Sequence, residues 1–383
     1  MDKRPNDAWG ARRSGHLADT KSRMPRSLAK TPTRKVRAAL IAAALACVLL
    51  LLLVPPAGAD AAGVAARKGS KAKASADHFR FFSPASFWNA PVPAAAKLDQ
   101  RSAKLVRALS TEVEAELADA SGPWIGTSRY SVPIYTVPAS QPAIRVRLTS
   151  PIFSPPLQAA FDRVPLPPEA TPSGGTDGHL VVWQPSTDRM WEFWRLVPGA
   201  EPSASWGGAM ENVSANRGVY DTDAWPDAEP WWGASASSLP VAGGLITLED
   251  LREGEIDHAL AIALPEIRAG VYAAPAQRTD GKSASPLALP EGARLRLDPK
   301  LDLAKLQMPR VTRLIAEAAQ RYGIFVRDGA GGVQLFAQDP VTAAKNPYTG
   351  PNGYFEGRYP HQLLASFPWE RLQVLKLDLH PDG

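Results

Sequence analysis

An imidazole and a carboxylate lie close together within an aromatic stretch in the middle of this 383-residue chain. His179 begins a short run that ends at Trp183, and Glu192 lies in a second run that ends at Trp194. Histidine and glutamate side chains transfer protons near neutral pH, and indole rings stack on the apolar faces of sugars. The pattern therefore predicts a saccharide platform with acid–base groups. The structural alternative is that both tryptophans pack in the core and that Glu192 pairs with an arginine.

Three further side chains are candidates for the same chemistry. Asp177 stands in a Gly-rich turn two residues before His179, where it could orient the imidazole or bind a cation. His258 lies in an alternating apolar run, and Arg278 lies in a polar turn where its guanidinium could neutralise a carboxylate or phosphate. The structural alternatives are a hydrogen-bonded core histidine and a surface turn. Nothing in the spacing of these residues requires a metal, and no motif identifies a cofactor.

A β-hairpin is the element that would position His179 and Glu192. Two runs rich in aromatic and β-branched residues, 179–183 and 190–195, flank a polar connection. Folding about that connection pairs Val181 with Glu192 and Trp183 with Met190. His179, Trp183, Glu192 and Trp194 then lie on one face of the hairpin, because side chains alternate along a strand. The other face is apolar and can meet the core.

The rest of the chain predicts many short strands and few helices. Helical spacing covers 98–117 and 309–322, strict alternation predicts a strand over 254–264, and 324–327 with 333–337 predicts a final hairpin. The 37 prolines and 29 glycines favour frequent turns. We therefore expect a β-rich single domain, a two-sheet sandwich of jelly-roll type with two or three peripheral helices.

The N-terminal quarter predicts export. Residues 1–37 form a basic segment, 38–54 form an uninterrupted apolar run, 55–77 read as a linker, and 78–383 form the exported β-rich domain. Basic region, apolar core and the small-residue site ending at Ala61 are typical of a signal peptide. The apolar run is also just long enough for an uncleaved membrane anchor. Both alternatives place the domain outside, secreted or tethered to the outer face of the cytoplasmic membrane.

The charge and the cysteine content exclude two classes of function. The net charge of +5 comes from the basic leader and linker, and the remainder of the chain is net acidic. A nucleic-acid partner thereby loses its main support. The single cysteine, Cys47, lies inside the apolar run, so the domain itself has neither a disulfide nor thiolate chemistry.

Several motifs resemble a large uncharacterised family of exported bacterial proteins. The shared features are a Gly-rich turn with Asp-x-His, a Gly-Glu-Ile-x-His-Ala-Leu strand, and a Pro-x-Gly-x-Arg-x-Arg-Leu segment. In this chain they read 175–179, 254–260 and 290–297. Two positions depart from that pattern, because Gly178 and Ala261 stand where arginine is frequent. The resemblance supplies positions and no reaction.

These observations favour an exported glycan-active enzyme, either a polysaccharide lyase or a glycoside hydrolase. In a lyase, Arg278 would neutralise a uronate while His179 or His258 takes the C5 proton. In a hydrolase, Glu192 would be the acid, and Asp177 or Glu255 the second carboxylate. The alternative is a non-catalytic cell-surface protein that binds carbohydrate or serves as a scaffold. The expected partners are a polysaccharide and, through an uncleaved 38–54, the membrane.

Overall fold

A computed structural model describes residues 80–152 and 154–382 of the chain. The expected leader, apolar segment and linker (1–77) lie outside these residues, and the described residues all belong to one unit. No helix within the described ranges combines the length and the apolarity needed to cross a bilayer.

The described residues form a mixed α/β structure in which strand outweighs helix. The five α-helices are α1 (Ser102–Asp119), α2 (Pro155–Phe161), α3 (Leu248–Glu253), α4 (Arg310–Arg321) and α5 (Pro360–Leu363). The strands of the first half are β1 (Trp124–Gly126), β2 (Ile134–Thr136), β3 (Arg147–Leu148), β4 (Leu180–Gln184), β5 (Arg189–Trp194), β6 (Ser203–Ala204) and β7 (Trp206–Met210). Those of the second half are β8 (Leu260–Leu264), β9 (Val271–Ala273), β10 (Arg294–Leu297), β11 (Ile324–Gly329), β12 (Gln334–Phe336), β13 (Leu372–Val374) and β14 (Leu379–Pro381).

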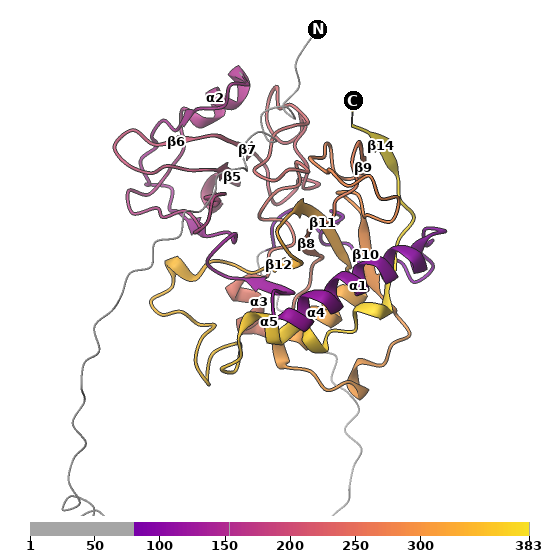
Figure 1. Cartoon of the computed structure of the whole chain (residues 1–383). Coiled ribbons are helices and arrows are strands. Elements are labelled where there is room, and N and C mark those ends of the chain that lie inside the picture. The colour runs from indigo at the N-terminus through magenta and orange to yellow at the C-terminus, as the bar shows by residue number, and fades with distance from the viewer. Residues whose placement is uncertain (1–79, 153, 383) are drawn as a thin grey trace, which may run out of the picture. The chain divides into compact units, whose positions relative to one another are not determined.

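Two larger sheets organise these strands (Figure 1). A four-stranded sheet has the order β2-β4-β5-β7, and a six-stranded sheet has the order β1-β12-β8-β11-β10-β13. Both sheets are mixed, since β2 runs parallel to β4 and β8 runs parallel to β11. The expected jelly-roll sandwich is therefore not seen, because that architecture is built from antiparallel strands. The β-rich character is confirmed.

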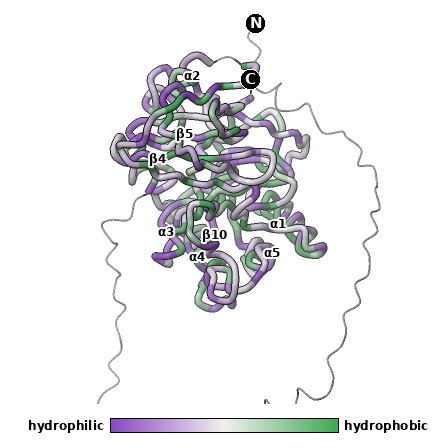
Figure 2. The backbone as a smooth tube through the Cα atoms, turned by 90° about the vertical axis from the view of Figure 1, so that its left-hand side faces the viewer, coloured by the Kyte–Doolittle hydropathy of each residue, from purple (hydrophilic) through white to green (hydrophobic). Residues whose placement is uncertain are grey.

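The two long helices follow their apolar periodicity. Hydrophobic and hydrophilic positions are interspersed along α1 (Figure 2). Its buried side includes Leu105, Val106, Leu109 and Val113. Helix α4 buries Val311, Leu314 and Ile315 in the same core, together with the six-stranded sheet. Gly323, with φ of 85°, follows the end of α4 and leads into β11.

The aromatic segment 81–89 ties the two sheets together. Phe81 lies against Trp183 of β4 with ring centroids 5.8 Å apart, and Trp88 lies against Phe325 of β11 at 5.0 Å. The Trp88 carbonyl also accepts a hydrogen bond of 2.6 Å from the Ala259 amide, just before β8. This segment, which we call the strap, holds strands that are far apart in the sequence.

One predicted pairing is wrong. Strands β11 and β12 do not form a hairpin with each other, because β8 lies between them. Strand β8 pairs with β11 in parallel and with β12 in antiparallel orientation. The strand predicted over 254–264 is shorter in the structure, because only Leu260–Leu264 belongs to the sheet.

Candidate active site

The β4–β5 hairpin has the register that the sequence predicts. Val181 pairs with Glu192, and Trp183 pairs with Met190. A 3-10 turn at Pro185–Thr187 makes the connection, and Asp188 follows with φ of 52°. Both faces of the hairpin are buried, however, so the face that carries Glu192 is not a surface.

A Ser- and Ala-rich loop, Gly233–Gly243, covers the Glu192 face. The Glu192 carboxylate accepts the Ala234 amide at Oε1 and the Val241 amide at Oε2, both at 2.8 Å. Glu192 is completely buried. Burial raises the pKa of Glu192 to about 7. The two amides, the Tyr220 hydroxyl and the charge of Arg327 act in the opposite direction but do not outweigh burial. With both oxygens engaged, this carboxylate fixes the two ends of the loop and is not exposed to a substrate.

His179 contacts the same loop. Its Nε2 lies 3.1 Å from the Ala234 carbonyl oxygen, which can only accept, so Nε2 carries the proton. The Nδ1 atom is buried and has no hydrogen-bond partner among the described residues. Burial lowers the pKa of His179 and Arg327 adds to this effect, while Asp177 raises the pKa. The imidazole is therefore neutral near pH 7, with a free lone pair on Nδ1.

Two buried arginines bind the loop from the other side. Arg278 donates from Nη2 to the Ser235 carbonyl at 2.8 Å and the Gly233 carbonyl at 3.3 Å. Arg327 donates from Nη1 to Val241 at 2.8 Å, and its guanidinium lies 3.8 Å from the centroid of the Phe336 ring. The structure thus brings His179, Glu192 and Arg278 together around one loop.

Three half-buried aspartates from separate segments act on one another and on these groups through their charges. Asp177 precedes β4, Asp280 follows β9, and Asp328 lies at the end of β11. A Cβ placed on Gly329 would lie 3.8 Å from the Asp280 Oδ1, so Asp280 adjoins the end of β11. The pairing of β11 with β8 shifts register between Val326 and Asp328, and this irregularity changes the direction of the side chains after Val326.

The aspartates act on one another electrostatically. Burial raises the pKa of Asp328 to about 8, and the charges of Asp280 and Asp177 add to the effect. Burial also raises the pKa of Asp280. Behind them, fully buried Glu291 accepts the Asp280 amide at 3.2 Å, and its pKa is raised by burial and by Asp280 and Asp328. At least one carboxyl of this aspartate cluster (Asp177, Asp280 and Asp328) is therefore protonated at neutral pH.

His258 lies elsewhere, between α3 and β8, and contacts the first turn of α3. Its Nε2 is 3.1 Å from the Asp250 Oδ2, and its Nδ1 is 2.8 Å from the Ala259 carbonyl oxygen. Asp250 belongs to a capping box with Thr247. Glu255, the other possible second carboxylate, is exposed and pairs with Arg321 at 3.5 Å. Neither residue joins the loop, and the His258 contacts support a structural role.

We expect the His258–Asp250 pair to make stability depend on pH. Burial alone would lower the pKa of His258, but the charge and hydrogen bond of Asp250 outweigh it, so the pKa is raised above 6.5. The stabilisation is complete below the unfolded value and is lost as the pH rises through the folded value. Thermal unfolding followed from pH 5 to pH 9 checks this. A His258→Gln variant should lose this pH dependence, and an unchanged profile would contradict it.

The two tryptophans are placed differently from the expected platform. Trp183 is only 5% exposed and packs under Phe81 of the strap. Trp194 is partly exposed, and the Arg195 guanidinium lies 4.1 Å from its ring centroid. A stacked sugar would therefore meet Trp194 before Trp183.

Gly178 and Ala261, which stand where the resemblance leads one to expect arginine, each meet a local constraint. Gly178 has φ of 48°, a left-handed backbone that disfavours larger residues. Ala261 is fully buried, and its amide donates to the Gly244 carbonyl at 2.9 Å. Arginine at position 261 would need space that Gly244 and its neighbours fill.

No family model, curated protein or solved structure matches the chain. The resemblance to exported bacterial proteins therefore stays a prediction. Within the described ranges, no three His, Cys, Asp or Glu side chains are grouped so that they could hold a metal ion.

Sequence reasoning missed four residues of this site: Asp280, Glu291, Arg327 and Asp328. Asp280 lies in the irregular segment after β9 and Asp328 lies near the end of β11, in the short motifs Thr-Asp-Gly and Arg-Asp-Gly. That repeated Asp-Gly signal after an apolar strand could have identified them. Glu291 and Arg327 carry no such signal, since their role follows from burial.

Proposed function

We propose that this chain is an exported glycoside hydrolase that acts on an uncharged stretch of polysaccharide. The supporting observation is the aspartate cluster, whose carboxyls are half-buried and in which burial raises the pKa of Asp328 to about 8. Glycoside hydrolysis needs one protonated carboxyl and one carboxylate. Environments that separate the pKa values of two acids supply that pair.

Asp328 is the general acid in this proposal. A pKa of about 8 keeps it protonated at neutral pH, and its side chain is half-buried where Glu192 is fully enclosed. It donates its proton to the glycosidic oxygen as that bond breaks. Asp177 supplies the second carboxylate, which takes a proton from water or attacks the anomeric carbon. The charge of Asp280 adds to the raised pKa of Asp328 and so favours the protonated form of Asp328.

The charge of the cluster favours the hydrolase over the lyase. Arg278 already faces Glu291, Asp328 and Asp280, and its Nη2 donates to two backbone carbonyls. It has little capacity left to neutralise a uronate carboxylate. The neighbouring aspartates would also repel an anionic sugar at close range.

A polysaccharide panel tests the proposal. The secreted or tethered full chain is incubated with neutral and uronate-containing polysaccharides, and reducing ends and unsaturated uronates are measured in parallel. New reducing ends from a neutral glycan, without unsaturated products, are expected. Unsaturated uronates would overturn the hydrolase in favour of the lyase.

One observation favours the second candidate, a non-catalytic carbohydrate-binding or scaffold protein. His179, Glu192 and Arg278 are each at most 5% exposed and bind the same loop, as residues of a polar core do. In that case glycan binding persists without turnover. Equilibrium binding to the same panel, measured beside the reducing-end assay, distinguishes the two.

A further inference from the structure

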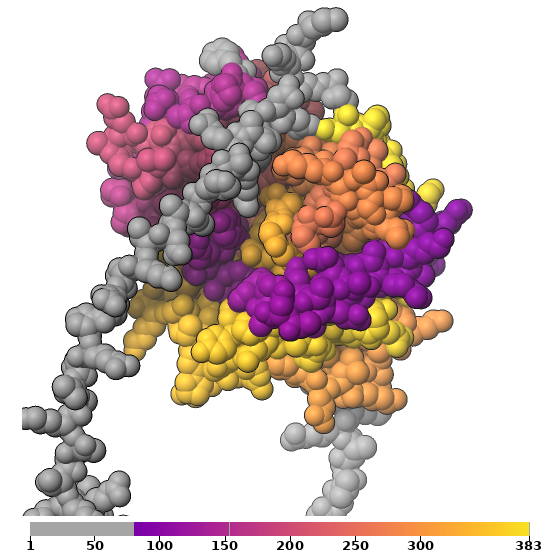
Figure 3. Space-filling view, in the orientation of Figure 1, coloured from indigo at the N-terminus to yellow at the C-terminus, as the bar shows by residue number. Residues whose placement is uncertain are grey.

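A pocket lies on the surface beside α1. Figure 3 shows α1 running across one face of the domain, with the orange residues of the second half directly above it. The pocket has a volume of about 120 Å³ and lies between α1 and two loops, 264–266 and 285–289. That volume is several times the roughly 10–15 Å³ that one water needs. None of its lining residues belongs to the aspartate cluster or the Gly233–Gly243 loop.

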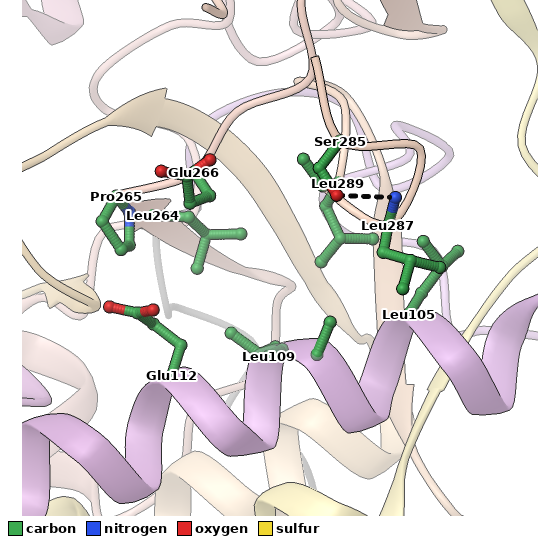
Figure 4. A pocket seen from close by; sticks show the side chains of 11 residues that line it. Leu105, Leu109, Glu112, Leu264, Pro265, Glu266, Ser285, Leu287 and Leu289 are labelled. Carbon is green, nitrogen blue, oxygen red and sulfur yellow. Dashed lines mark hydrogen bonds between the residues drawn. The ribbon is translucent and has the colours of Figure 1, made fainter. Parts of the chain in front are cut away.

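The walls of this α1 pocket are mainly aliphatic. Leu105, Leu109, Leu264 and Leu289 are almost fully buried at its base, while Leu287 at the rim is 38% exposed. A 3.2 Å hydrogen bond from the Leu287 amide to the Ser285 hydroxyl shapes the upper loop (Figure 4). Arg101 on the α1 side donates to the Pro286 carbonyl at 3.2 Å and so holds that loop beside the helix. The pocket is a formed apolar site.

Two carboxylates give this apolar pocket a negative end. Figure 4 shows Glu112 and Glu266 on the same side of the pocket, with Leu105, Leu287 and Leu289 toward the other. Within the described residues neither carboxylate makes a hydrogen bond or an ion pair.

We propose that the α1 pocket binds an aliphatic primary ammonium group. The alkyl chain lies against the leucines, and the ammonium lies between Glu112 and Glu266. Each part of such a ligand meets its complement, because burial of methylene groups and an opposite charge at one end both favour binding. A neutral or anionic alkyl chain of the same length gains the burial of its methylene groups but not the favourable charge interaction. This inference is independent of the proposed hydrolase activity.

Titration of the full chain with pentylammonium, pentan-1-ol and pentanoate, followed by calorimetry or by NMR shifts, tests the site. Pentylammonium should bind most tightly, and more weakly as salt rises. Glu112→Gln and Glu266→Gln should each weaken it by about two- to fivefold, the range of partly exposed ion pairs. Glu114→Gln is the matched control, since Glu114 is exposed on the same helix outside the pocket.

An Ala108→Leu variant fills the pocket from α1 and should abolish binding of all three probes. Leucine is a good helix former, and unchanged circular dichroism would show that the variant folds. The proposal is overturned if pentan-1-ol binds as tightly as pentylammonium, if Glu114→Gln weakens binding as much as Glu112→Gln, or if wild type shows no saturable binding. Loss of hydrolysis in the glycan panel has no bearing on these outcomes.

Discussion

Replacing Glu192 by alanine is expected to lower the free energy of unfolding by about 2–5 kcal/mol. The Ala234 and Val241 amides would lose their acceptors in a fully buried place. Each buried donor left unsatisfied costs about 1–3 kcal/mol. Arg327 would also lose the favourable charge of Glu192. Chemical denaturation with one probe for each sheet measures the change.

Glu211→Ala is the matched control for that experiment. Glu211 follows β7 and pairs with Arg189 at 2.5 Å, but both side chains are partly exposed. Surface pairs contribute about 0–1 kcal/mol, so this variant should remain close to wild type. Equal destabilisation by the two substitutions would show that Glu192 does not hold the loop.

Asp328→Asn is expected to reduce hydrolysis by about a hundredfold to ten-thousandfold. That range is typical of losing a positioned general acid. Asparagine keeps the size of the side chain and can still accept the Gly329 amide, which Asp328 Oδ1 now accepts at 2.9 Å. The fold should therefore persist while the transferable proton is lost. Initial rates of reducing-end release, at substrate concentrations above and below saturation, measure the effect.

The pH profile gives that variant a second, independent readout. Wild-type activity should fall as the pH rises through about 8, because Asp328 then loses its proton. The interacting aspartates titrate together, so this limb belongs to the cluster. In Asp328→Asn the residual activity should lack the limb. Glu255→Gln, at an exposed ion pair away from the cluster, should retain both the rate and the profile.

Local sequence patterns predicted the individual strands better than they predicted which strands pair with one another. The β4–β5 register follows from alternation and one short turn, which are contained within 16 residues. The β11–β12 prediction used the same logic and failed, because β8 offers both strands a neighbour. Strand order depends on packing between distant segments, and the local sequence around a turn does not determine that packing.

The site was predicted in part for the same reason. His179, Glu192 and Arg278 do meet, but they meet through the backbone of Gly233–Gly243. That loop is all small residues and aliphatics, with no chemical signature in the sequence. Its buried backbone needs hydrogen-bond partners, and the polar side chains nearby supply them. Residues that look catalytic in a sequence can thus be the supports of a buried loop.

The place of β1 in the six-stranded sheet has a consequence for how the chain folds in time. Trp124 lies beside Gln334 and Gly126 beside Phe336, so the edge of this sheet joins segments about two hundred residues apart. Topologies rich in distant contacts fold slowly, because the entropy of closing a long loop is lost before the contacts that it allows can stabilise the chain. β1 therefore gains this partner only after β12 has been synthesised. A chain truncated before residue 334 would lack that partner for β1.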